Sequence, residues 1–108
     1  MPTDVVQGAL VFVIDLTITE EVDDAVAAEH LAAHRRWFAS HVESGDFLLL
    51  GPRRDRSGAG IILARAESRA ALEEILAGDV YHPEGATYEV AEFKATMGAP
   101  ALADLLES

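Results

Sequence analysis

Cysteine is absent from this chain of 108 residues. Its absence excludes disulfides, thiolate nucleophiles and thiolate metal sites, and it fits a reducing compartment. Long apolar runs are missing too, because no stretch reaches the roughly 18 residues that a membrane span needs. The first residues also lack the basic segment of a signal peptide. We therefore expect a cytoplasmic protein that does not bind membranes.

Basic residues are scarce, with 8 lysines and arginines against 19 aspartates and glutamates, a formal net charge of -11. Such a charge repels phosphate backbones and anionic lipid, so we expect no nucleic acid partner. Half of the residues are hydrophobic. A chain of this length and composition is expected to build one domain around a single modest core.

The first third of the chain predicts a strand followed by a long helix. Residues 9–18, "ALVFVIDLTI", are rich in β-branched residues and alternate along the run, which is typical of a strand. Thr19 precedes acidic residues and predicts an N-cap, and Gly45 predicts the end of the helix. The expected helix therefore covers about residues 20–44.

The rest of the chain predicts a hairpin, a shorter helix and a last strand. Two apolar runs at residues 46–52 and 58–66 flank the polar loop "RRDRSG" and predict the hairpin. Ser68 predicts the N-cap of a second helix that stops at Gly78, and residues 86–96 alternate like a strand. A further short helix is expected after Pro100.

This order predicts an α+β, ferredoxin-like β-α-β-β-α-β domain, with a four-stranded antiparallel sheet and helices on one face. The other sheet face stays bare in such a fold. Val11 and Val13 are expected on that face, and a second sheet would cover them. We therefore expect a homodimer.

Three of the four histidines, His30, His34 and His41, fall in the long predicted helix. His34 lies near the middle of its apolar arc, where an imidazole without hydrogen-bond partners costs about 1–3 kcal/mol. Histidines satisfied by backbone carbonyls are the simplest interpretation of such positions. His30 and His34 resemble half of a metal site that His41 could join. No glutamate follows the first histidine as in a zincin helix, and no third ligand stands at a fixed spacing, so we expect no metal.

Other catalytic patterns are weak. The serines lack the strained G-x-S-x-G turn of a nucleophile, and Gly58 and Gly60 lead into a strand where a phosphate loop would lead into a helix. Trp37 and Phe38 have the spacing of core residues. What remains is general acid-base chemistry by an imidazole, with a carboxylate to orient it and a cavity for substrate.

Five segments occur in one order and spacing: "HRRWF", "SGDFLLLGP", "GAGIILARAESRAALEEIL", "GDVYHPEG" and "YEVAEFKAT". Together they resemble the YCII-related (YciI-like) family of dimeric α/β-barrel proteins. The resemblance covers about residues 10–96 and leaves residues 97–108 as a tail of a single YCII-related domain, 1–108.

The resemblance implies a site. In that family a histidine on the first helix and an aspartate that opens a D-P-[FY] segment are thought to form an enzymatic pair. Here they correspond to His34 and Asp79, with Tyr81 as the aromatic residue and Gly85 closing the motif. His34 then borders a cavity between helix and sheet.

This chain departs from the family at Val80, where proline is usual, and at the inserted His82-Pro83. Two hypotheses follow. The first is a small enzyme without a cofactor, an acid-base catalyst of isomerase or lyase type for isomerisation or elimination on a small cyclic or carbonyl compound. The fold-related muconolactone isomerase and chlorohydroxyquinol dehydrochlorinase suggest it by analogy. The second is a non-catalytic module that binds a small molecule or another protein, which the two departures favour slightly.

In the first hypothesis His34 is the general acid or base, and Asp79 orients it or accepts a second proton. Tyr81 lines the pocket or donates to an oxyanion. Further candidates for substrate binding are Asp15, Arg53 and Trp37. Each has a plainer interpretation: a solvent-facing polar group on a strand, a solvated loop charge and a core residue, respectively.

Overall fold

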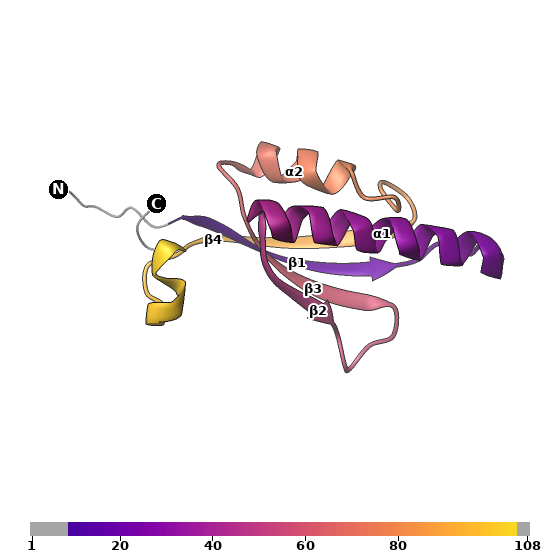
Figure 1. Cartoon of the computed structure of the whole chain (residues 1–108), viewed down its shortest axis with the longest axis horizontal. Coiled ribbons are helices and arrows are strands. Elements are labelled where there is room, and N and C mark those ends of the chain that lie inside the picture. The colour runs from indigo at the N-terminus through magenta and orange to yellow at the C-terminus, as the bar shows by residue number, and fades with distance from the viewer. Residues whose placement is uncertain (1–8, 106–108) are drawn as a thin grey trace.

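The computed structural model describes residues 9–105. Its elements are β1 (Leu10–Ile18), α1 (Asp24–Ser44), β2 (Phe47–Pro52), β3 (Ala59–Arg65), α2 (Arg69–Ala77), β4 (Ala86–Lys94) and the 3-10 helix η1 (Pro100–Leu105). The strands pair antiparallel in the order β2-β3-β1-β4. Both α-helices lie on one side of the sheet (Figure 1). The predicted α+β, ferredoxin-like fold is confirmed.

The ends of α1 agree with the sequence pattern at one end only. Gly45 ends the helix in a left-handed conformation, with φ at 90°, and its N–H donates to the Val42 carbonyl. The expected N-cap at Thr19 is wrong, because Asp23 caps the helix and accepts from the Val26 N–H at 2.9 Å. The Thr19 N–H instead donates to the Gly85 carbonyl at 2.9 Å, so this residue belongs to a loop contact.

The main core lies between the sheet and the two helices. The predicted inward face of β1 is buried there, with Phe12 and Ile14 both 0% exposed. Trp37 joins the helices, because its indole N–H donates to the Ile75 carbonyl at 3.0 Å. Leu72 of α2 is fully buried in the same core. Within residues 9–105, neither helix is long and apolar enough to cross a membrane.

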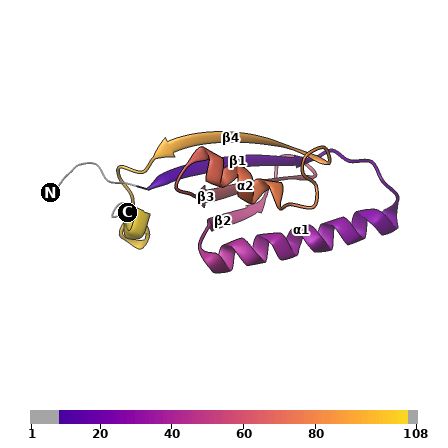
Figure 2. The ribbon, with the colours of Figure 1, turned by 90° about the horizontal axis from the view of Figure 1, so that it is seen from above.

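Neither α1 nor α2 covers the opposite face of the sheet (Figure 1 and Figure 2). The expectation that Val11 is bare on this face is wrong, since only 1% of it is exposed. It packs in a small second cluster with Ala9 and Ala95. These two residues continue the pairing of β1 with β4, since the Ala95 N–H donates to the Ala9 carbonyl. The exposed apolar residues of this face are Leu49, Ile61 and Phe93, at 69%, 37% and 47% exposure.

Candidate functional site

The C-terminal end of α2 places Asp79 against α1. Gly78 ends α2, and the Asp79 N–H donates to the Leu76 carbonyl at 3.1 Å, which fixes the backbone of the turn. The Asp79 carboxylate then lies 2.7 Å from Nδ1 of His34, measured to Oδ1. Both side chains are buried, at 5% exposure for His34 and 0% for Asp79. The structure thus brings together the two residues that the family resemblance named as a pair.

Tyr88 on β4 is the second partner of Asp79. Its hydroxyl donates to the other carboxylate oxygen, Oδ2, at 2.7 Å. Burial raises the pKa of Tyr88 well above its usual value, and the hydrogen bond and negative charge of Asp79 raise it further. The sequence pattern does not single out Tyr88. Strand alternation places it on the inward face of β4, but only the fold shows that it meets the turn after α2.

Aromatic rings hold the imidazole in place. The ring centroid of His34 lies 4.2 Å from that of Phe38, 4.9 Å from that of Tyr81 and 5.6 Å from that of Trp37. The Trp37 ring is stacked at an interplanar angle of 24°. Rings packed on several sides restrict the imidazole to one orientation. His34 is therefore positioned by its neighbours as well as by Asp79.

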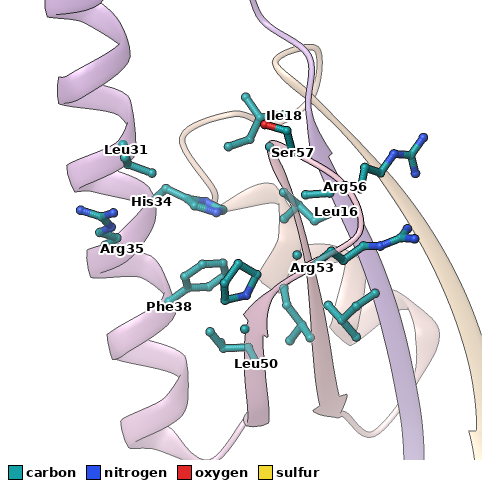
Figure 3. Close-up of a pocket in the computed structure, with 17 residues that line it drawn as sticks. Leu16, Ile18, Leu31, His34, Arg35, Phe38, Leu50, Arg53, Arg56 and Ser57 are labelled. Atoms are coloured by element: carbon teal, nitrogen blue, oxygen red, sulfur yellow. The ribbon is translucent and has the colours of Figure 1, made fainter.

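A cavity of about 430 Å³ lies between α1 and the β2–β3 hairpin, and His34 forms part of its wall. Figure 2 shows α1 along the β2 side of the sheet, and Figure 3 shows His34 reaching from α1 toward the hairpin. Within residues 9–105, no hydrogen bond joins Nε2 of His34 to another residue. Because Nδ1 is bonded to Asp79, Nε2 is the nitrogen left for a ligand.

Of the four residues expected to bind substrate, only Arg53 lines this cavity. Trp37 is packed in the core, and Tyr81 is 4% exposed, buried against His34. Asp15 projects from the uncovered sheet face, where it bonds Arg53 at 2.9 Å. Asp15, Trp37 and Tyr81 do not line this cavity, and their expected role in substrate binding stays a prediction.

The Arg53 guanidinium is held by two carboxylates. It bonds Asp55 through Nε and Nη2 at 2.9 Å, and Asp15 through Nη1 at 2.9 Å. The hydrogen bonds to Asp55 are the largest cause that raises the pKa of Arg53. Arg53 therefore joins the hairpin loop to β1, and each of its three guanidinium nitrogens already donates to a carboxylate.

The two other histidines of α1 also bond carboxylates, but outside the cavity. Nδ1 of His30 lies 2.6 Å from Glu20 Oε2, and Nδ1 of His41 lies 2.8 Å from Asp46 Oδ2. The His41 hydrogen bond is the main cause that lowers the pKa of Asp46. Among the described residues, no group of three histidines, cysteines or carboxylates is arranged to hold a metal ion.

The loop from Asp79 to Gly85 is fixed by close backbone approach. A Cβ at Gly85 would lie 2.9 Å from the Tyr81 carbonyl oxygen, so only glycine fits without a shift. Val80, which stands where the family usually has proline, is 38% exposed, and the inserted His82-Pro83 is exposed too. These departures therefore lie at the surface of the loop, away from the buried contact between His34 and Asp79.

Comparisons with known proteins agree with this architecture. A family model, described as the YCII-related domain, matches residues 11–94. Among solved structures, the chain is similar to a mutant of SnoaB, a cofactor-independent oxygenase from Streptomyces nogalater, with a TM-score of 0.55 and 20% identity. The match covers 87% of this chain and 99% of that one, and at this identity it shows the fold alone. No match to a curated protein was found.

Proposed function

Because this chain belongs to the family of YCII-related domains, we propose that it is a small enzyme that moves protons on a cyclic or carbonyl compound without a cofactor. The observation that carries the proposal is the 2.7 Å hydrogen bond between His34 and the buried Asp79 at the wall of a cavity. The similar fold of SnoaB, a cofactor-independent oxygenase, supports catalysis without a cofactor on this architecture.

The hydrogen bonds define what each atom would do. Both oxygens of an Asp79 carboxylate accept, one from His34 Nδ1–H and one from the Tyr88 hydroxyl. Nε2 of His34 then carries the lone pair and acts as the base. When Nε2 takes a proton, the Asp79 carboxylate stabilises the imidazolium that forms. Tyr88 touches only Asp79 in this scheme, so it is a positioning residue.

The chemistry is a proton transfer with balanced steps. Nε2 removes a proton from a carbon beside a carbonyl, and the electron pair of the C–H bond moves into the carbonyl to form an enolate. Return of that proton to a different carbon completes an isomerisation. Departure of a leaving group from the adjacent carbon, with its electron pair, completes an elimination. A mainly apolar cavity strengthens the charge interactions that accompany either step.

We also infer that the protein forms a homodimer through its uncovered sheet face. Three large apolar residues are exposed there, Leu49, Ile61 and Phe93. Oδ1 of Asp15 on the same face is buried and has no hydrogen-bond partner within residues 9–105. A partner subunit that supplies apolar cover and a donor would satisfy both features.

The catalytic proposal is tested by solvent exchange. Cyclic ketones and lactones are incubated with the protein in D2O, and deuterium incorporation at the carbon beside the carbonyl is followed by NMR. The wild-type protein should exchange at least one class of compound. His34→Asn should lower the rate by about 10²–10⁴-fold, the usual contribution of general acid-base catalysis. Asp79→Asn should lower it as well, because the imidazole loses its charged partner.

A second histidine–carboxylate pair on the same helix provides the matched control. His41→Asn and Asp46→Asn remove a hydrogen bond of nearly the same length, but neither residue lines the cavity. Both variants should exchange at the wild-type rate. Equal losses in the two sets of variants would contradict the proposal. A compound that binds at His34 while no compound exchanges would favour the non-catalytic binding module.

A further inference from the structure

The cavity at His34 differs in charge from the rest of the molecule. The chain has 19 acidic residues and a formal net charge of -11, yet among residues 9–105 no aspartate or glutamate lines this cavity. Three of the 8 basic residues do, namely Arg35, Arg53 and Arg56. The described residues that line the cavity therefore include basic side chains and no acidic ones, unlike the chain as a whole.

The interior itself is hydrocarbon. Its wall includes six large apolar side chains, from β1, α1, β2 and β3: Leu16, Ile18, Leu31, Phe38, Leu50 and Ile62. A charged group moved into such surroundings without a partner loses its hydration at a large cost. The body of a ligand that fills this space must be apolar, and any charged group must remain at the rim.

Two of the three arginines are available to such a charged group. Arg53 is held by Asp15 and Asp55, whereas neither Arg35 nor Arg56 makes an ion pair within 4.0 Å in the part of the chain that the structure describes. Figure 3 shows the Arg35 guanidinium beside α1 and the Arg56 guanidinium on the hairpin side, so the two lie outside the apolar interior on opposite sides of the cavity. Because no carboxylate holds them, these long side chains can turn toward a ligand at the rim.

We propose that the ligand of this cavity is a compact, mainly apolar organic anion whose acidic group stays at the rim, within reach of Arg35 or Arg56. The inference rests on the proposed function, since it names the class of compound on which His34 would act. The apolar body lies against the wall within reach of His34, and the acidic group is paired in solvent. A cation of the same shape is repelled by both arginines, and a neutral compound gains nothing from them.

The test uses two fluorescent probes that differ by one charged group. 8-Anilinonaphthalene-1-sulfonate carries a sulfonate, and N-phenyl-1-naphthylamine has the same ring framework without it. In titrations at low ionic strength, the wild-type protein should bind the anionic probe several-fold more tightly than the neutral one. Each exposed ion pair is expected to contribute about 1.4- to 5-fold. Added salt should weaken binding of the anionic probe alone.

Charge-matched variants assign that preference to the two arginines. Arg35→Gln/Arg56→Gln should abolish the preference for the anionic probe and leave binding of the neutral probe unchanged. Arg36→Gln/Arg54→Gln removes the same charge from the neighbouring positions, which do not line the cavity, and should keep the preference. Loss of the preference in both double variants would overturn the proposal, because it would show a general charge effect. Equal binding of the two probes to the wild-type protein would overturn it too.

A pair of tryptophan substitutions on α1 locates the bound probes. Leu31→Trp fills the cavity and should weaken the binding of both probes. Val42→Trp, at a 50% exposed position outside the cavity, should leave the binding of both unchanged. If Leu31→Trp leaves the affinity for both probes unchanged, the probes bind outside the cavity and the proposal is overturned. None of these titrations requires turnover. Titrations without the predicted preference would contradict the proposed ligand class but not the catalytic role of His34 and Asp79. Absence of deuterium exchange would contradict the catalytic role but not the ligand class.

Discussion

At the scale of single residues, burial separates the histidine at the cavity from two others with the same partner type. All three histidines of α1 bond a carboxylate through Nδ1, at 2.6–2.8 Å. Only His34 is buried together with its carboxylate and also lines the cavity. A buried ionisable pair is costly to desolvate, so it is retained where other hydrogen bonds and a function support it. Burial and position at the cavity therefore identify His34 as the functional candidate, whereas the histidine–carboxylate hydrogen bond alone does not.

Tyr88 supports this pair, and its removal should be measurable as a loss of stability. Tyr88→Phe deletes the hydroxyl that donates to Asp79 Oδ2 and leaves a buried carboxylate oxygen without its partner. We expect the free energy of unfolding to fall by about 1–3 kcal/mol in urea titrations at neutral pH. Tyr81→Phe, the matched control, removes a hydroxyl that makes no hydrogen bond to any residue between 9 and 105, and it should change stability much less. Equal effects of the two substitutions would contradict this role.

The raised pKa of Tyr88 also predicts how stability depends on alkaline pH. The folded state holds the phenol proton above the usual tyrosine pKa of about 10, whereas the unfolded state releases it. Folded protein then binds more protons than unfolded protein, so stability is complete below about pH 10 and falls as pH rises. Tyr88→Phe should make this fall shallower in urea midpoints measured across that range. An unchanged slope would show that Tyr88 titrates as it does in the unfolded chain.

At the scale of elements, the beginning of α1 shows where local sequence signals compete. Thr19 and Asp23 are both good N-cap residues, and the choice depends on a distant contact, the Gly85 carbonyl that accepts from Thr19 N–H. Asp23→Ala should lower the free energy of unfolding by about 0.5–2 kcal/mol, since it deletes the side-chain acceptor of the Val26 N–H. Thr19→Ala should cost less than about 0.5 kcal/mol. The reverse order in urea unfolding would restore Thr19 as the cap.

The elements themselves follow from short-range patterns. Alternation identifies β1 and β4, and Ser68 and Gly45 mark helix ends by local hydrogen bonds and backbone conformation. Contacts between elements do not follow from such patterns. The burial of Val11 depends on the chain after β4, and the Arg53–Asp15 pair joins residues that are 38 positions apart. For the site, the resemblance to YCII-related proteins paired His34 with Asp79, whereas Tyr88 becomes visible only when β4 is placed beside the turn after α2.

At the scale of the whole molecule, the uncovered sheet face is the feature that one chain leaves unexplained. If a second copy covers it, light scattering at micromolar concentration should give twice the chain mass of 11.6 kDa. Leu49→Asp places a charge on the edge strand β2, at the most exposed of the three large apolar residues of this face (69%), and should yield monomers. Val42→Asp adds the same charge to an exposed position of α1 and should leave the dimer intact. A monomeric wild-type protein would contradict the dimer.

The whole account depends on the state of one imidazole, and nitrogen NMR of the His34 ring measures it directly. Long-range proton–nitrogen spectra distinguish the two neutral tautomers. With Asp79 bonded to Nδ1 at 2.7 Å, we predict that neutral His34 carries its hydrogen on Nδ1, with an unprotonated Nε2 whose signal moves when 8-anilinonaphthalene-1-sulfonate is added. A hydrogen on Nε2, with a signal indifferent to the probe, would contradict the account.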